Sequence, residues 1–276
     1  MDVNHKIAQE AEHGIIRSRK GGMLLGAKVA IEDYGFSLLE DLLGQKTYFQ
    51  ILLLHVTGRM WEKRVADWLE ALFLCVSYPD DRIWCNQIGS LAATMGASPV
   101  AAVSAGILAS DSRLYGPGTQ RAGVEFIRWA VEQKRKGKTA QEVVAAFAKK
   151  DAAGVPLIPG YARPLVGGRD ERIEALERVS EQLGFERGEH LAFAYGIDTV
   201  MRDEFGKGMN ALGYCVAFLA DLGMRGEEQY RLVSAMVQSG VLACYSEWAD
   251  RPVETFLPLR CDDIEYTGVS PREVPR

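Results

Sequence analysis

The chain has 276 residues, of which 47% are hydrophobic and 25% charged, and its formal net charge is −5. This composition is typical of a globular protein with a sizeable core. The negative net charge argues against nucleic acid as the main partner. The longest apolar runs, such as residues 51–54, are far too short to span a bilayer, so we expect no membrane segment.

The first twenty residues mix charges of both signs and contain no apolar stretch, so they do not resemble a secretory signal. The cysteines have no metal-ligand spacing such as C-x-x-C, and their odd number argues against a full disulfide framework. We therefore expect a cytoplasmic protein with free, buried thiols and no metal. The five cysteines are Cys75, Cys85, Cys215, Cys244 and Cys261.

Helix signals follow one another along the whole chain, because apolar residues recur at helical spacing and capping residues precede them. The predicted helices cover residues 47–56, 61–76, 99–109, 120–136, 139–150, 170–183, 189–204, 209–222 and 227–248. The clearest starts are Ser98-Pro99 and the capping box from Thr139 to Glu142. The clearest stops are Gly184 and Gly223.

Strand signals are few, and only residues 14–17, 23–25 and 263–267 are candidates. The sequence therefore predicts an all-α protein. Residues 88–110 consist largely of Ala, Gly and Ser, which let helices approach closely in a core or at a subunit interface. The long loop 151–168, rich in proline, glycine and apolar residues, is typical of a functional loop rather than a disordered one.

Three motifs stand in a distinctive order: Tyr115-Gly116-Pro117-Gly118-Thr119, then Ile158-Pro159-Gly160-Tyr161-Ala162-Arg163, then Gly168-Arg169-Asp170-Glu171-Arg172. Together they resemble the citrate synthase family. The opening segment 23–60 is similar to that of short citryl-CoA lyase-like proteins. The tail 261–266 is similar to that of the lyase module of ATP-citrate lyase.

The resemblance implies an all-α homodimer in which a large and a small helical domain enclose a cleft. Carried over to this chain, the large, dimerisation domain is 1–118 plus 216–276, and the small, CoA-binding domain is 119–215. The small-residue helices within 88–110 would then lie at the dimer interface. The implied ligand is coenzyme A, as an acyl-CoA substrate or product.

The family uses two histidines and an aspartate, and none of the three is found at the matching positions of this chain. Thr119 and Arg163 stand where the resemblance places the histidines; with one residue deleted there, Arg163 instead matches the family arginine that follows the second histidine. A threonine hydroxyl or a guanidinium cannot shuttle a proton near neutral pH. Asn210-Ala211-Leu212 stands in place of the family's Asn-Val-Asp, and leucine is not a base. The chain either carries out a related reaction on a non-citrate substrate or has kept the fold without the chemistry.

The resemblance implies roles for the remaining motif residues. Thr119 and Arg163 would polarise a carbonyl, Arg172 and Arg121 would bind substrate carboxylates, and Arg169 would help bind CoA. The loop that would receive the adenine consists of Ile158, Pro159, Gly160, Tyr161 and Ala162. The alternative for these arginines is solvation or ion pairing at the surface.

Other titratable residues could replace the missing base, but plainer roles are favoured for each. We expect Asp198, Asp203, Glu204 and Asp221 to be solvated carboxylates on helix faces. We expect His190 to be an exposed structural histidine and His55 to pack in the core. Three functions stay open: a carbon–carbon lyase or acyltransferase, a non-catalytic CoA-binding or scaffold protein, and an unrelated all-α interaction protein.

Overall fold

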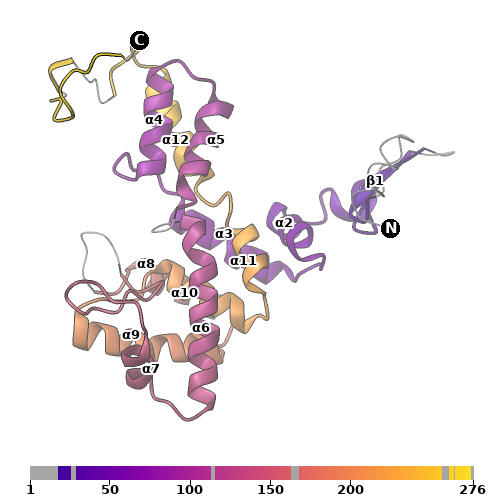
Figure 1. Ribbon diagram of the computed structural model, residues 1–276. Coiled ribbons are helices and arrows are strands. Elements are labelled where there is room, and N and C mark those ends of the chain that lie inside the picture. The colour runs from indigo at the N-terminus through magenta and orange to yellow at the C-terminus, as the bar shows by residue number, and fades with distance from the viewer. Residues whose placement is uncertain are drawn as a thin grey trace. The chain divides into compact units, whose positions relative to one another are not determined.

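The computed structural model describes residues 18–25, 29–112, 116–162, 168–256, 261–263 and 265–274, and helices dominate them (Figure 1). The predicted all-α class is confirmed. The chain forms two compact units, one from residues 1–76 with 111–236 and one from residues 77–110 with 237–276. The predicted division into a small domain over 119–215 and a large domain stays a prediction.

The first unit opens with a small antiparallel sheet of β1 (Gly21–Leu25), β2 (Val29–Asp33) and β3 (Phe36–Ser37) in that order. β1 includes the predicted strand 23–25, whereas the candidate 14–17 lies outside the described residues. The candidate 263–267 is not a strand in its described part: Cys261–Asp263 (η3) is a short 3₁₀ turn, and 265–267 has no regular structure.

Helices form the rest of the first unit, and their starts and ends follow the sequence signals closely. The elements are the π-helical turn η1 (Leu38–Leu42), α2 (Tyr48–Thr57), α3 (Lys63–Val76), the 3₁₀ turn η2 (Gly116–Thr119), α6 (Gln120–Arg135), α7 (Ala140–Ala146), α8 (Arg172–Gln182), α9 (Glu189–Phe205), α10 (Ala211–Asp221) and α11 (Gly226–Leu232).

The core of this unit centres on α10, most of whose residues are buried, because neighbouring helices cover it. The Trp68 ring stacks on Phe218 with centroids 4.0 Å apart. The Trp68 Nε1–H donates to Ser180 Oγ over 2.9 Å, and the Ser180 and Tyr214 hydroxyls lie 3.0 Å apart. The polar atoms of this aromatic core therefore have hydrogen-bond partners, as burial requires.

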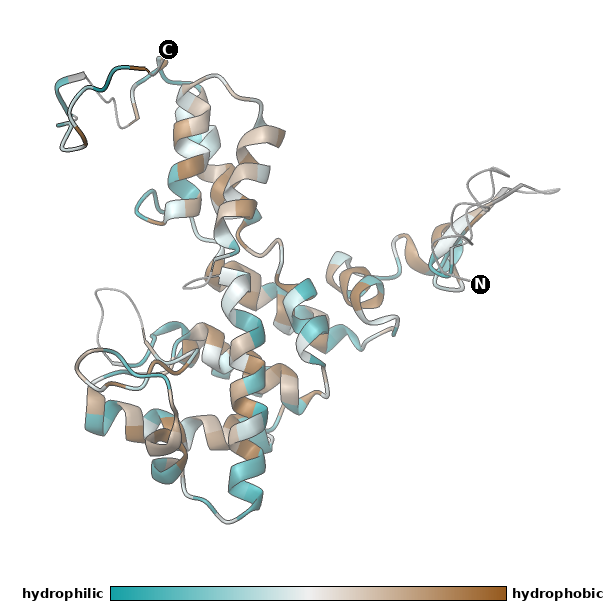
Figure 2. Cartoon of the chain, viewed as in Figure 1, coloured by the Kyte–Doolittle hydropathy of each residue, from teal (hydrophilic) through white to brown (hydrophobic). Residues whose placement is uncertain are grey.

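In the second unit α4 (Trp84–Thr94), α5 (Pro99–Ser110) and α12 (Gln238–Ala249) pack side by side (Figure 1). Glycines make the close approach possible: a Cβ at Gly89 or Gly106 would lie 2.9 Å or 2.6 Å from Val241 Cγ1. α5 is largely apolar, as its mostly tan to brown colour in Figure 2 shows, yet Val100 and Leu108 are about three-quarters exposed.

Two predicted helices are longer than the real ones. The helix predicted to run to Lys150 ends at Ala146, because Phe147 turns extended and Lys150 bridges to Pro156. The helix predicted over 227–248 is two helices, α11 and α12, separated by 233–237. In that break the Ser234 hydroxyl bonds to the carbonyl of Arg231, a local contact that competes with the helical pattern.

Several side chains lie elsewhere than predicted. His55 is exposed rather than in the core, with its Nε2 2.8 Å from Asp33 Oδ2. Asp198 is fully buried and Asp221 is half-buried with hydrogen-bond partners, so neither is a solvated carboxylate, whereas Asp203 and Glu204 are exposed as expected. Of the cysteines, Cys75, Cys85, Cys215 and Cys244 are free thiols, and Cys75 is only half-buried.

Among the described residues no helix has the length and apolar character to cross a membrane.

Candidate functional site

The Ile158–Ala162 loop is anchored by two buried side chains. Ile158 and Tyr161 point into the core of the first unit, and the Tyr161 hydroxyl donates to the carbonyl oxygen of Ala194 on α9 over 2.9 Å. Pro159 is half-buried between them and Ala162 is exposed. Gly160 is also buried, so the loop packs against the core and only its end, at Ala162, is exposed.

Gly160 brings the loop into direct contact with the start of α10. Its φ of +89° is in the left-handed region that glycine tolerates best. A Cβ at Gly160 would lie 2.6 Å from the Cα of Gly213, which leaves no space for a side chain. The Asn210 N–H donates to the Gly160 carbonyl over 2.9 Å and joins the two segments.

A hollow of about 450 Å³ lies beside this loop, between α6, the end of α7 and the segment that leads to Pro159. Its floor is aromatic: Phe126 contacts Trp129, with ring centroids 6.0 Å apart, and Phe147, with centroids 5.4 Å apart. Leu157 and Pro159 form the wall next to the loop. The hollow can receive a flat, largely apolar group.

Glu125 and Lys149 bring opposite charges to the lining of this hollow, and both are exposed. Phe126, Trp129 and Lys149 belong to none of the sequence motifs described above. A signal was present, because Ala122, Phe126 and Trp129 are spaced to share one face of α6. The pair Lys149-Lys150 also directly precedes the proline-rich loop.

Two of the predicted ligand-binding arginines pair with buried aspartates. Arg172 holds Asp170 with two nitrogens, the shorter distance being 2.6 Å, and its Nη1 donates to the carbonyl of Cys75. Burial acts to raise the pKa of Asp170, but the hydrogen bonds and charge of Arg172 outweigh it and hold that pKa below its usual range. A substrate carboxylate at Arg172 would share the guanidinium with Asp170.

Arg169 pairs with Asp198 at 2.5 Å, and Arg202 lies 3.1 Å from the same carboxylate. Partial burial acts to lower the pKa of Arg169, but the hydrogen bond to Asp198 and its charge raise it above the ordinary value. About a third of the Arg169 side chain is exposed. Two cations share one buried carboxylate, so this cluster keeps a net positive charge that an anionic ligand can use.

The remaining predicted residues lie in different surroundings. The Thr119 hydroxyl donates to the Gly116 carbonyl over 2.9 Å, at the start of α6. Arg121 lies over the Tyr230 ring and pairs with Glu227 at 2.9 Å, so it is tied to α11. Arg163 lies outside the described residues.

Most of the carboxylate candidates for a base have structural partners, and so does His190, which is half-buried rather than exposed as expected. His190 Nδ1 lies 2.8 Å from Asp221 Oδ1, and both oxygens of Asp221 accept backbone N–H groups at the start of α9. Leu212, at the position of the family's aspartate, is half-buried and brings only hydrocarbon. No group of three metal-ligating side chains occurs in the part of the chain that the structure describes.

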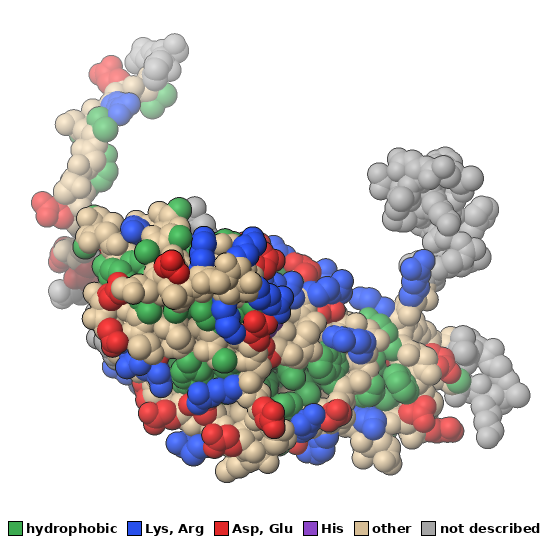
Figure 3. Space-filling model, turned by 90° about the horizontal axis from the view of Figure 1, so that it is seen from below, with side chains coloured by type: hydrophobic (Ala, Val, Ile, Leu, Met, Phe, Trp, Pro, Cys, Tyr) green, Lys and Arg blue, Asp and Glu red, His purple; other side chains and the backbone are tan. Residues whose placement is uncertain are grey.

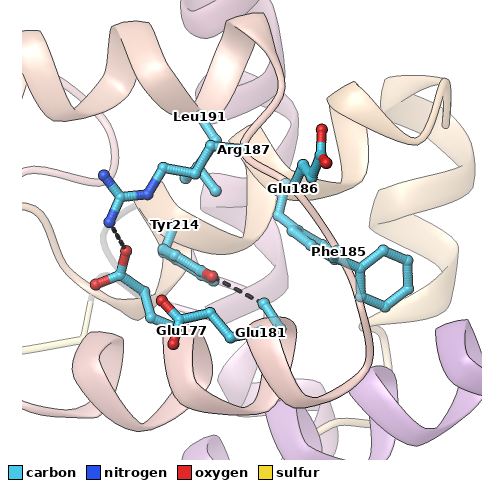
Figure 4. A pocket seen from close by; sticks show the side chains of 9 residues that line it. Glu177, Glu181, Phe185, Glu186, Arg187, Leu191 and Tyr214 are labelled. Carbon is cyan, nitrogen blue, oxygen red and sulfur yellow. Dashed lines mark hydrogen bonds and ion pairs between the residues drawn. The ribbon is translucent and has the colours of Figure 1, made fainter.

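A smaller hollow of about 130 Å³ lies between α8, the 183–188 turn and α10 (Figure 4). Arg187 pairs with Glu177 in its lining, and the Tyr214 hydroxyl turns to Ser180. Glu181 and Glu186 add two further carboxylates. Elsewhere, basic and acidic side chains are interspersed on the face shown in Figure 3.

Solved structures resemble this chain over nearly its whole length. A citryl-CoA lyase from Hydrogenobacter thermophilus matches with a TM-score of 0.74 and 25% identity, over 95% of this chain and 98% of that one. The chain is a citrate synthase-like protein. An unrelated all-α fold, the third possibility raised by the sequence, is therefore wrong.

Two more distant structures share the citrate synthase-like fold. An ATP citrate lyase from Methanothrix soehngenii, solved with citrate and coenzyme A, has a TM-score of 0.73 and 15% identity, over 98% of this chain and 45% of that one. A citrate synthase from Thermoplasma acidophilum, solved with carboxymethyl coenzyme A and oxaloacetate, has a TM-score of 0.62 and 15% identity, over 91% and 61%. No model of a protein family and no curated protein sequence matches the chain.

Proposed function

We propose that this chain binds coenzyme A or an acyl-CoA thioester and makes or breaks a carbon–carbon bond next to the thioester, with an acid other than citrate. The observation that carries the proposal is the Ile158–Ala162 loop, which is held against α10 and has an aromatic hollow beside it. The structural similarity to a citryl-CoA lyase over nearly the full length of both chains supports the proposal. We also propose that the protein is a homodimer and is located in the cytoplasm.

In this proposal the adenine enters the hollow beside Leu157 and Pro159, and Lys149 and Arg169 attract the phosphates. Thr119 and Arg163 polarise the carbonyl that reacts, and Arg172 and Arg121 bind carboxylates of the partner acid.

A second function has an observation of its own in its favour. The three positions that the family uses for acid–base chemistry hold Thr119, Arg163 and Leu212, of which none titrates near neutral pH. A CoA-binding protein without catalysis, pairing with an active homologue, needs the loop and the hollow but no base. Robust turnover of an acyl-CoA by the isolated chain would exclude this alternative.

Titration calorimetry with CoA and acetyl-CoA tests the proposal on the wild type, Lys149→Ala and Lys136→Ala. We expect the wild type to bind and Lys149→Ala to weaken binding about fivefold, because one exposed ion pair contributes roughly 1 kcal/mol. Lys136→Ala removes an exposed lysine at the end of α6 that does not line the hollow, so its affinity should equal that of the wild type. A folded wild type that binds neither ligand contradicts the proposal.

Proposed dimerisation rests on the outer face of α5, where Val100, Ser104 and Leu108 are exposed one turn apart. An exposed apolar helix face of this kind favours a protein contact. We expect Leu108→Glu to change a dimer into a monomer in size-exclusion chromatography with light scattering. Lys136→Glu also adds negative charge but lies just after α6, far along the chain from α5, and should stay dimeric. A wild type that is monomeric at micromolar concentration contradicts this prediction.

A further inference from the structure

Asn210 contacts the helix and the loop at the same time. As the residue that caps α10, it accepts the Gly213 N–H with Oδ1 over 3.0 Å. Its Nδ2 donates to the Ala162 carbonyl oxygen over 2.8 Å, and its backbone N–H donates to the Gly160 carbonyl oxygen over 2.9 Å. One asparagine therefore fixes two carbonyls of the Ile158–Ala162 loop as well as the start of a helix.

The turn that carries Asn210 is itself held by two fully buried carboxylates. The Met209 N–H donates to Asp198 Oδ1 over 2.6 Å, and the Ala211 N–H donates to Asp170 Oδ2 over 3.1 Å. The Asp170 N–H donates back to the Met209 carbonyl over 3.0 Å. Residues 209–211 are therefore a rigid support whose position does not depend on the loop.

We infer that Asn210 is a positioning residue for coenzyme A: it presets the shape of the Ile158–Ala162 loop without touching the reacting atoms. The inference rests on the proposed function, because it assigns the loop to CoA. Its physical basis is preorganisation: a loop already fixed in the free protein loses less conformational freedom when a ligand binds. The carboxamide is needed for this because it brings an acceptor for the helix and a donor for the loop.

Asn210→Asp separates the two tasks. The carboxylate still accepts the Gly213 N–H, and a negative charge at a helix start is favourable, so thermal stability should stay close to that of the wild type. The new carboxylate cannot donate a hydrogen bond to the Ala162 carbonyl, so the substitution brings two acceptors, a carboxylate oxygen and that carbonyl oxygen, close to each other. We expect the CoA dissociation constant to rise about tenfold, which corresponds to ~1.4 kcal/mol.

Two further variants distinguish loop positioning from helix capping. Asn210→Ala loses both contacts, so it should be less stable and bind CoA at least as weakly as Asn210→Asp. Thr47→Ala removes a comparable cap from α2, where the Thr47 hydroxyl accepts the Gln50 N–H over 3.2 Å. It should lose stability but keep the CoA affinity of the wild type.

Hydrogen exchange in the ligand-free protein provides a readout that does not depend on CoA. The Tyr161 N–H donates to the Ile158 carbonyl over 3.2 Å, and we expect its exchange to be about tenfold faster in Asn210→Asp, while the Gly213 amide stays protected. Unchanged exchange and unchanged CoA affinity would overturn the inference and leave Asn210 as a helix cap only. Faster exchange in a protein whose wild type does not bind CoA would support the positioning role and overturn the proposed function.

Discussion

Gly160→Ala is expected to lose measurable CoA binding and to lower the free energy of unfolding by about 3 kcal/mol. Two effects add at this position. The φ of +89° disfavours any residue with a Cβ, and the new Cβ would lie 2.6 Å from the Cα of Gly213. Since the nearest atoms belong to the backbone, relief requires the loop to move away from α10, which breaks the bond between the Asn210 N–H and the Gly160 carbonyl.

Gly154→Ala is the matched control for this prediction. Gly154 precedes Gly160 in the same loop and has a φ of +81°, but an added Cβ meets nothing within 4 Å. The free energy of unfolding of Gly154→Ala should fall by about 1 kcal/mol and its CoA affinity should be unchanged, because only the positive φ disfavours the alanine. Chemical denaturation and calorimetry on both variants check this. Equal losses in the two variants would show that the contact with Gly213 does not decide the shape of the loop.

The sequence predicted best where a local mechanism fixes the structure. The capping box at Thr139 is present, with the Thr139 N–H donating to Glu142 Oε2 over 2.8 Å and the Glu142 N–H donating to Thr139 Oγ1 over 3.2 Å. Gly184 and Gly223 have the positive φ that a helix stop requires. In each case the partners lie within a few residues, so the pattern alone defines the contact.

Predictions failed where the partner lies far away in the sequence. The apolar neighbours of His55 predict a core position, but Asp33, 22 residues earlier, holds it at the surface. The sequence predicts a solvated Asp198, but Arg169, 29 residues earlier, pairs with it in the interior. A carboxylate on a helix can be buried only when a cation reaches it, and one sequence does not show which cation does so.

The candidate site illustrates the same division. The family resemblance predicts that Gly160 and Tyr161 belong to a ligand loop, and in the structure both residues are buried where this loop packs on its support. The hollow beside it needs α6, the end of α7 and Leu157 to meet, which no single motif specifies. The arginine assignments stay predictions: Arg169 and Arg172 each have a structural carboxylate, and each keeps roughly 30% of its side chain exposed for a ligand.

The Asp170–Arg172 pair leads to a prediction about pH. Asp170→Asn keeps the size of the side chain but removes the charge that Arg172 pairs with at 2.6 Å in the interior. Breaking a buried ion pair costs about 3 kcal/mol, so we expect the free energy of unfolding at pH 7 to fall by about that amount. The variant should also bind CoA more weakly, because Asp170 helps to hold residues 209–211.

The sign of the pH dependence follows from the lowered pKa of Asp170. A carboxyl group whose pKa is lower in the folded than in the unfolded chain stabilises the protein above the unfolded value, about 3.9, and this contribution is lost as the pH falls through the folded value. The difference between wild type and Asp170→Asn should therefore be constant from about pH 5 to 8 and shrink as the pH falls below about 4. Urea denaturation at several pH values measures this difference in the free energy of unfolding. The control is Asp203→Asn, which replaces an exposed carboxylate on α9 and should leave the free energy of unfolding unchanged. A difference that grows in acid would mean that Asp170 is protonated in the folded protein and that Arg172 is held by other contacts.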